Sequence, residues 1–450
     1  MADGRIHTAR RLPRNDSVSA WVAMLPPRTP QPALHGPTRA DVAIVGGGFA
    51  GLAAARRLLQ IDPGLSICLL EAQAVAEGAT GRNSGFLIDL PHEVSSDQYA
   101  GDVAQADGVA TRPDIFANRA AIALARGMAE EGGWGTDVFN PSGKYNVAMG
   151  TQGDHHILAY AQQLRALGEP CTVLGAADTA AFTGTQAYTS AIYTPGTVMV
   201  QPAAYVRNVA DLLARSITLH ENSPVLSMQR QGNSWALRTQ HGSVSANKVI
   251  LATNGHAQSF GFFARQLMHV FTYASMTEAF DPRRLGGERQ WAATPALPMG
   301  TTVRRVQGLE GDRILVRSRY TYNPGLEVSA ADIASAGRVH DRKFADRFPM
   351  LAGVRMQYRW AGAMALTWNS VPAFGELEPG LFAACACNGV GATKATASGM
   401  AAADAALQQH TPLLRIFEAQ AQPRTLPPQP FLTVGAKASL RLREWGAGRE

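Results

Sequence analysis

The chain has 450 residues, of which 46% are hydrophobic and 17% are charged, and 41 lysines and arginines stand against 35 acidic residues. This length fits one large domain or two to three smaller ones, and the apolar share excludes disorder over most of the chain. A net charge of +6 is mild for this length, and no basic block alternates with aromatic residues, so we expect no nucleic-acid partner.

The chain shows no pattern typical of export or of a membrane anchor. Its four cysteines are too few for a disulfide scaffold. No run of about 18 apolar residues is present, so we expect no membrane span. The apolar run after Arg10 and Arg11 is short and ends at two prolines, unlike an export signal. These features predict a cytoplasmic protein without integral membrane contact.

The first 71 residues divide into an arm and a strand–turn–helix–strand unit. Residues 1–40 carry six prolines and are predicted to form an extended arm on the surface. A β-branched run at residues 41–45 predicts a buried parallel strand. A glycine turn at residues 46–51, a helix at 52–59 and a second strand at 65–70 follow. This arrangement is typical of a parallel α/β fold.

The glycine turn matches a dinucleotide-binding fingerprint. Gly46 allows the tight turn, Gly48 lets a pyrophosphate approach the backbone, and Gly51 lets helix and strand pack closely. The helix that follows offers free N–H groups to phosphate, and Glu71 is placed to accept hydrogen bonds from ribose hydroxyls. The alternative is that the glycines serve packing only. The residues predicted to bind cofactor here are Gly46, Gly48, Phe49, Ala50, Gly51, Glu71 and Ala72.

A second glycine-rich segment, residues 77–85, follows the second strand. A nicotinamide enzyme has no need of such a segment there, whereas a flavin enzyme must surround a large ring with close backbone. Arg82 is placed to meet a phosphate, and the residues after it are placed to line the isoalloxazine ring; the alternative is a solvent-exposed loop. The candidates are Gly78, Thr80, Gly81, Arg82, Asn83, Ser84 and Gly85.

A third segment, residues 387–399, reads as the end of a strand, a glycine-rich turn and the start of a helix. Backbone N–H groups at the start of that helix would stabilise the negative charge of a reduced flavin. Lys394 is placed to assist as a catalytic residue, or else it is a solvated lysine. The candidates are Gly389, Val390, Gly391, Thr393 and Lys394.

The remaining pattern is mixed. Helices are predicted near residues 113–131, 154–167, 201–214, 330–347 and 392–408. Strands are predicted near residues 218–219, 224–229, 234–239, 242–245, 248–253, 267–277, 313–322 and 380–387. The basic, amphipathic segment at residues 437–445 is either a helix packed on the body or a membrane contact.

These motifs together resemble the FAD-dependent D-amino-acid oxidase superfamily, in its glycine, sarcosine and amine oxidase branch, and within it the gamma-glutamylputrescine oxidoreductase type. The segments that carry the resemblance are residues 41–51 with Glu71, 78–85, 252–255, 360–362 with Pro372 and Gly375, and 388–399. One departure is Ser84, where that group commonly has glycine. The resemblance adds Val225, Thr253, Asn254 and Gly255 to the predicted cofactor site.

The resemblance implies an α/β fold with a Rossmann-type parallel sheet that binds FAD and an antiparallel sheet that covers the flavin. The expected FAD-binding domain comprises residues 41–90, 196–260 and 351–420, and the cover domain residues 91–195 and 261–350, with residues 421–450 as a tail. Relatives attach flavin through a cysteine or histidine that is absent at residues 364–366 and 82–83. Noncovalent FAD is therefore expected, and no metal.

The activity implied by the resemblance is oxidation of a C–N bond in an amine or amino acid. Hydride passes to flavin N5, the imine hydrolyses, and O2 is reduced to H2O2. The first alternative is a dehydrogenase of the same fold that passes electrons to a quinone or carrier. The second is a flavoprotein that acts on RNA or only binds a partner.

The strand at residues 313–322 is expected to face the flavin and bind substrate. Alternation places Arg317, Arg319 and Thr321 on one face and Ser318, Tyr320 and Tyr322 on the other. An arginine in the cavity would bind a carboxylate bidentately; the alternative is an exposed arginine face with core tyrosines. The substrate candidates are Arg317, Arg319, Tyr322, Tyr273, Trp368 and Asp89, with Tyr320 and Lys394 as catalytic candidates.

Overall fold

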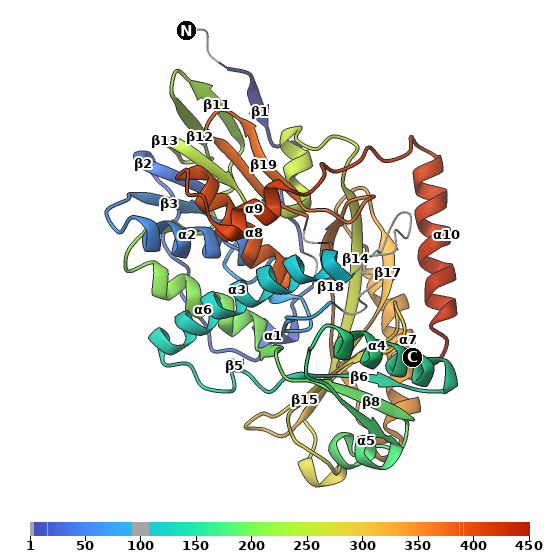
Figure 1. Cartoon of the computed structure of the whole chain (residues 1–450). Helices are drawn as coiled ribbons and strands as arrows, with labels where there is room; N and C mark the ends of the chain where they lie inside the picture. Colours follow the sequence, from blue (N-terminus) through green and yellow to red (C-terminus); the bar gives the residue numbers. More distant parts are fainter. Residues whose placement is uncertain (1–3, 16, 92–107, 387, 390) are drawn as a thin grey trace.

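Two sheets of different construction organise the chain (Figure 1). The computed structural model describes residues 4–15, 17–91, 108–386, 388–389 and 391–450. The nine-stranded sheet runs β1 (Ile6–Thr8), β11 (Ser227–Gln231), β12 (Ser234–Arg238), β13 (Gly242–Leu251), β2 (Gly36–Val45), β3 (Ile67–Leu70) and β10 (Thr218–His220), with β20 (Leu381–Cys385) beside β13 and β19 (Ala373–Glu378) beside β20.

The centre of the nine-stranded sheet is parallel, as the sequence predicts. β2 pairs in parallel with β3 and β13, and β13 pairs in parallel with β20. Val42 and Ile44 pack into the helical side of the sheet, whereas Ala43 and Val45 pack on its opposite side. Burial on both faces explains the continuous β-branched run. The sequence predicts two strands at residues 242–245 and 248–253, but the structure has one strand there, β13. It pairs with β2 along both of these stretches, from Gly242 to Ala246 and from Lys248 to Leu251.

Helices cover one face of the nine-stranded sheet, and the chain also forms a small three-stranded sheet. The helices that share its hydrophobic core are α2 (Phe49–Ile61), α3 (Gly108–Gly132), α6 (Pro202–Leu213), α8 (Gly391–Ala406) and α9 (Pro412–Glu418), together with the short α1 (Ala20–Ala23). The small sheet consists of β4 (Phe86–Leu87), β9 (Val198–Val200) and β5 (Phe139–Asn140).

The second sheet has eight strands and is antiparallel except between β15 and β6. Its order is β18 (Met356–Leu366), β14 (Met268–Thr277), β17 (Arg313–Tyr322), β16 (Thr302–Val306), β15 (Trp291–Pro295), β6 (Lys144–Ala148), β8 (Ser190–Thr194) and β7 (Thr172–Gly175). The helices beside it are α4 (Thr151–Ala166), α5 (Ala176–Thr183), α7 (Ala330–Arg347) and α10 (Phe431–Gly446), the last at the right edge of Figure 1.

The two sheets alternate along the chain, so neither comes from one continuous segment. β18 lies in the eight-stranded sheet although residues 351–420 are assigned to the FAD-binding domain from the sequence. The arm is more than a surface segment, because Trp21 in α1 is completely buried. Within the described part of the chain, no helix combines the length and apolar character needed to cross a membrane.

Candidate active site

The glycine turn between β2 and α2 brings the backbone closer together than side chains would allow. A Cβ at Gly51 would lie 1.8 Å from the carbonyl oxygen of Gly46, and one at Gly46 would lie 2.6 Å from that of Ala252. Gly48 is the N-cap residue of α2 and has no side chain that could cap the helix. The first N–H groups of the helix have no intrahelical partner, so they remain available to an anion.

Glu71 follows β3 and lies against this turn. One carboxylate oxygen accepts a hydrogen bond from the N–H of Gly47 at 2.7 Å, and the other accepts one from the N–H of Gln73 at 3.0 Å. Burial raises the pKa of Glu71 above the usual carboxyl value, against the lowering effect of these hydrogen bonds. A hydroxyl donor from a bound ligand would stabilise the ionised form further.

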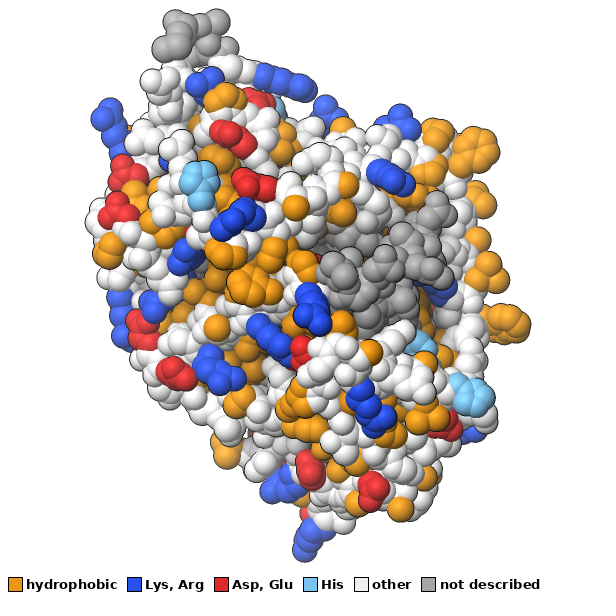
Figure 2. Space-filling model, in the orientation of Figure 1, with side chains coloured by type: hydrophobic (Ala, Val, Ile, Leu, Met, Phe, Trp, Pro, Cys, Tyr) orange, Lys and Arg blue, Asp and Glu red, His pale blue; other side chains and the backbone are white. Residues whose placement is uncertain are grey.

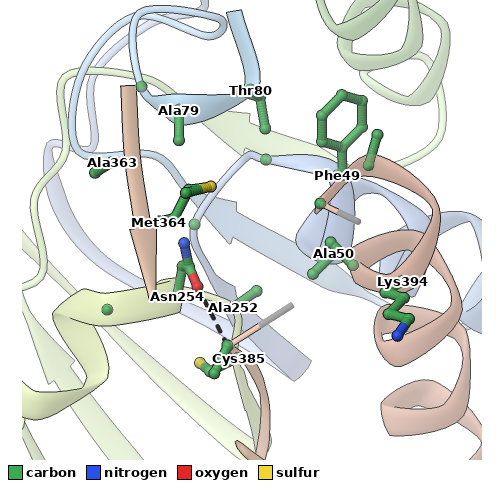
Figure 3. Close-up of a pocket in the computed structure, with 18 of the residues that line it drawn as sticks. Phe49, Ala50, Ala79, Thr80, Ala252, Asn254, Ala363, Met364, Cys385 and Lys394 are labelled. Atoms are coloured by element: carbon green, nitrogen blue, oxygen red, sulfur yellow. Dashed lines mark hydrogen bonds between the residues drawn. The ribbon is translucent and has the colours of Figure 1, made fainter. Parts of the chain in front are cut away.

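A cavity of about 810 Å³ extends from the glycine turn to the eight-stranded sheet. Figure 3 shows Phe49 and Ala50 of α2, Thr80, Asn254 and Met364 around it. The predicted cofactor residues that line the cavity are Gly46, Gly48, Phe49, Ala50, Glu71, Ala72, Gly78, Thr80, Arg82, Asn83, Ser84, Val225, Thr253, Asn254, Gly255, Gly389, Gly391 and Lys394. Gly51, Gly81, Gly85 and Thr393 do not line it, and Val390 lies outside the described residues.

The second glycine-rich segment is fixed by contacts within the chain. The guanidinium of Arg82 donates to the carbonyl oxygens of Glu77, Ser17 and Ala361. Trp360 donates in turn to the carbonyl oxygen of Arg82 at 2.9 Å. Arg82 therefore ties the segment to the arm and to β18, and its contact with a phosphate remains a prediction.

Arg304 of β16 supports the end of the same segment, and no motif in the sequence points to this residue. The side chain is buried and donates to the carbonyl oxygens of Ser84, Gly85 and Val200 at 2.7–3.2 Å. Its guanidinium carbon lies 5.1 Å from the ring centre of Trp21, and burial lowers its pKa to about 10. This cation joins the arm, the glycine segment and the eight-stranded sheet.

The third glycine-rich segment leads into α8, which packs closely on α2. A Cβ at Gly399 would lie 2.0 Å from the carbonyl oxygen of Ala50. Lys394 lines the cavity from the first turns of α8, with its Nζ 3.7 Å from an Oδ of Asp114. Both residues thus contribute charge to the cavity wall.

The N-terminal arm forms a further wall of the cavity. No motif in the arm indicates this role. Arg11, Leu12, Pro13, Arg14 and Asn15 line the cavity beside the glycine turn. The amide of Asn15 donates to Gln73 Oε1 at 2.7 Å and to the carbonyl oxygen of Glu77 at 3.0 Å. Asn15 thereby ties the arm to the residues just after Glu71 and to the start of the second glycine-rich segment.

The two arginines of this arm should attract an anionic cofactor. We expect the double variant Arg11→Ala/Arg14→Ala to raise the dissociation constant of FAD about three- to tenfold, since exposed charges contribute about 1 kcal/mol or less each. The matched control, Arg5→Ala/Arg10→Ala, changes two exposed arginines of the same arm that do not line the cavity. Flavin fluorescence titration at two salt concentrations measures the effect, and equal constants for both double variants would contradict it.

Strand β17 does not keep the alternation predicted for it. Ser318 pairs with Tyr273, but Tyr320 pairs with the adjacent Thr272, so Arg319 is an extra residue in a β-bulge. Its φ of 69° is left-handed. The prediction that Arg317, Arg319 and Thr321 share one face is therefore wrong, and Arg317 instead shares a face with Tyr320.

The bulge separates the two arginines. Arg317 lines the cavity, and its guanidinium carbon lies 4.8 Å from the ring centre of Tyr320. Among the described residues, no carboxylate pairs with Arg317. Arg319 instead donates to a carboxylate oxygen of Glu444 in α10 at 2.7 Å and does not line the cavity.

The other predicted substrate and catalytic residues occupy different positions. Tyr273 lines the cavity, and its hydroxyl lies 2.7 Å from that of Thr321. Tyr320, Tyr322 and Trp368 belong to a hydrophobic cluster under the C-terminal segment and do not line the cavity. Burial raises the pKa of Tyr320 above its usual value.

Asp89 also lies outside the cavity wall. It is buried, one carboxylate oxygen accepts a hydrogen bond from Thr197 at 3.1 Å, and the other lies 3.5 Å from Arg119. Its carbonyl oxygen accepts a hydrogen bond from Asn118, which does line the cavity. Asp89 is therefore placed behind the wall, where it helps to position Asn118.

The end of the cavity near Arg317 contains polar groups that the sequence did not single out. Thr272, Thr294 and Thr302 come from three strands of the cover sheet, and Asn118 comes from α3. The hydroxyl of Thr272 is buried and has no hydrogen-bond partner among the residues that the structure describes. Isolated threonines and asparagines carry no recognisable spacing, so only the fold brings these groups together.

The residues present fit FAD. The cavity volume is near the upper end of the range of about 300–1,000 Å³ typical of ligand sites. Helix N–H groups for phosphate and Glu71 for ribose lie at one end, and the second glycine segment approaches from the side. The buried hydroxyl of Ser398 lines the cavity without a hydrogen-bond partner among the described residues, as expected of a group that contacts a ligand.

Comparisons with known proteins agree with this geometry. The family model described as "FAD dependent oxidoreductase" (DAO) matches residues 41–405. The chain is 25% identical over 412 residues to "Probable oxidoreductase OrdL" of Rhizobium meliloti, covering 89% of this chain and 91% of that protein. It is 25% identical over 372 residues to "Gamma-glutamylputrescine oxidoreductase" of Escherichia coli, covering 78% and 80%.

A solved structure shows the same fold. Glycine oxidase from Geobacillus kaustophilus superimposes with a TM-score of 0.68 at 22% identity, covering 83% of this chain and 96% of that one. The predicted combination of a parallel dinucleotide-binding sheet with an antiparallel cover sheet is confirmed by this match and by the observed topology.

Proposed function

Since this chain belongs to the DAO family of FAD-dependent oxidoreductases, we propose that it oxidises the C–N bond of an amine or amino acid. FAD is the cofactor of the family. The names of two similar proteins, gamma-glutamylputrescine oxidoreductase and glycine oxidase, support an amine or amino-acid substrate. We favour O2 as the electron acceptor.

The observation that carries the proposal is the continuity of one cavity. It joins the glycine turn and Glu71 at one end to Arg317 at the other. Arg317, which pairs with no carboxylate in the part of the chain that the structure describes, is suited to bind a substrate carboxylate through two parallel hydrogen bonds. Its position in the cover sheet would place that carboxylate on the far side of the cavity from the cofactor's phosphates.

In the proposed reaction, residues of this chain position the substrate and stabilise negative charge. FAD, when bound, supplies the acceptor for the two electrons and the hydrogen removed from the substrate carbon. Lys394 and the N-terminal end of α8 would stabilise negative charge at the edge of the cavity. Arg317 would hold the substrate carboxylate, and the hydroxyl of Thr272 is available to the amine or carboxylate.

Few side chains that line the cavity could act as a general base. Among its described lining residues, the carboxylates are Glu71 at the dinucleotide end and Asp114 beside Lys394. His256 also lines the cavity, but burial lowers its pKa to about 4, so it is neutral near pH 7. This set agrees with a reaction that needs a neutral, positioned amine more than a strong base.

Anaerobic reduction tests the proposed function. The purified protein, mixed without oxygen with a panel of amines and amino acids, should lose its flavin absorbance with at least one of them. Readmission of air should restore the absorbance and release H2O2 if the protein is an oxidase. Bleaching that persists in air but is reversed by a quinone would favour the dehydrogenase alternative. Absence of bleaching by the whole panel would contradict C–N oxidation.

We also propose that FAD is held noncovalently. The backbone and hydroxyl groups at the cavity wall offer hydrogen bonds, and the cavity residues Met364 and Asn83 are not nucleophiles. The thiol of Cys385 also lines the cavity, but burial raises its pKa to about 12, which keeps it protonated. Acid precipitation should therefore release all the flavin into the supernatant, where chromatography against FAD and FMN standards should identify it as FAD. Colour retained in the washed pellet would contradict the proposal.

A further inference from the structure

Helix α10 exposes large hydrophobic side chains on the side that faces away from the body. Phe431, Val434, Leu442 and Trp445 are 72%, 66%, 66% and 83% exposed. Spacings of three, eight and three residues place them on one face of a helix with 3.6 residues per turn. Figure 2 shows hydrophobic side chains protruding along the right edge of the molecule, where Figure 1 places α10. We call these four residues the outer stripe.

Helix α10 is held firmly on the body by its opposite face, so the exposure of the outer stripe is not caused by a loose helix. Leu432 and Leu440, on the opposite face, are buried in the cluster that contains Tyr320 and Tyr322. Glu444 accepts hydrogen bonds from Arg319 at 2.7 Å and from the backbone N–H of Tyr320 at 2.6 Å. The helix is therefore apolar on two faces, of which the body covers only one.

The charges beside the outer stripe are positive. Lys437 and Arg441 are exposed, and both lie next to the stripe on the helix surface. The single carboxylate of the helix, Glu444, is 13% exposed and already paired with Arg319 and Arg441. A surface that offers hydrocarbon and cations together is complementary to a layer of anionic headgroups over acyl chains.

We propose that α10 is a membrane-surface helix that binds anionic lipid. Trp445, Phe431 and Leu442 enter the boundary between headgroups and acyl chains, and Lys437 and Arg441 contact lipid phosphates. The outer stripe forms a narrow, protruding ridge, unlike the flat patch of about 800 Å² per partner in a stable protein interface. A second copy on the same stripe would also bring the two rows of cations close together.

Vesicle sedimentation of the flavin-loaded full chain tests the proposal. We expect the protein to sediment with vesicles of 70% phosphatidylcholine and 30% phosphatidylglycerol, and far less with phosphatidylcholine alone. The double variant Leu442→Ser/Trp445→Ser should bind at least about tenfold more weakly, because it removes two exposed apolar side chains. Lys437→Gln should weaken binding and reduce its dependence on salt.

The matched control removes exposed hydrophobic residues elsewhere. Leu309 and Leu158 are 108% and 53% exposed and lie outside α10, so Leu158→Ser/Leu309→Ser should bind vesicles like the wild type. Unchanged flavin content would show that each variant folds. A wild-type protein that stays in the supernatant with anionic vesicles would overturn the proposal. So would a stripe variant that binds vesicles normally but converts a dimer to a monomer, since the occupant would then be a second copy.

Discussion

Replacing Glu71 by glutamine should weaken FAD binding about ten- to a hundredfold while leaving the fold intact. The carboxylate lines the cavity beside the glycine turn, where ribose hydroxyls of FAD would donate to it. Hydrogen bonds to a charged group contribute about 1.5–3 kcal/mol each, and the loss of one corresponds to the stated range. Glutamine keeps one oxygen that can accept from Gly47 or Gln73, so the backbone around the turn should keep its shape.

The measurement is the dissociation constant of FAD for the flavin-free protein. Glu77→Gln is the matched control, because Glu77 is exposed in the next segment of the chain and does not line the cavity. Circular dichroism of both variants reports the fold. Equal constants for wild type and Glu71→Gln would mean that another residue holds the ribose.

The same carboxylate should make FAD binding dependent on pH. Burial raises the pKa of Glu71 in the free protein, and ribose donors favour the ionised form, so FAD binding should lower that pKa. Affinity should therefore fall as the pH falls through the raised value, starting at a higher pH than for an ordinary carboxylate. Titrations at several pH values should show this slope in the wild type and a flatter one in Glu71→Gln.

Arg317→Lys should lower kcat/KM for carboxylate-bearing substrates by about a hundredfold or more. Lysine keeps the charge but cannot reproduce the planar pair of parallel hydrogen bonds, and about 2.7 kcal/mol of lost transition-state binding corresponds to a hundredfold. Plain amines do not use the guanidinium, so their kcat/KM should change less than about threefold. Steady-state kinetics with matched amine and amino-acid pairs measures both effects.

The bulge supplies the control for this experiment. Arg319 lies two residues further along the same strand but pairs with Glu444 outside the cavity. Arg319→Lys can keep that ion pair, and it should leave both substrate classes nearly unaffected. An equal loss for amines and amino acids in Arg317→Lys would refute the carboxylate clamp and direct attention to Tyr273 and Thr272.

The dinucleotide end of the site was predictable because its signal is local. Gly46, Gly48 and Gly51 act within one turn, and Glu71 ends the next strand of the same unit. Each of these residues is required by backbone geometry or by a ligand that contacts contiguous chain. The predicted strand and helix of this unit agree with β3 and α2 to within three residues, whereas β2 begins at Gly36, inside the segment assigned to the arm.

The substrate end was less predictable because its contacts join distant segments. The bulge at Arg319 depends on how β17 pairs with β14 and not on the sequence of β17 alone. The same holds for Arg304, whose partners lie in the segments around Ser84 and Val200. Strands such as β6, β15 and β16 have five residues each, which is too short for a clear period.

The position of the arm has a consequence for the order of events during synthesis. The arm is synthesised before its partners, yet β1 pairs with β11, His7 contacts the carbonyl oxygen of Phe260, and its Nε2 lies 2.7 Å from Glu378. The full set of partners exists only after about five sixths of the chain has been made. The glycine turn and Glu71 are then long complete, so the nascent protein passes through a stage with the arm undocked.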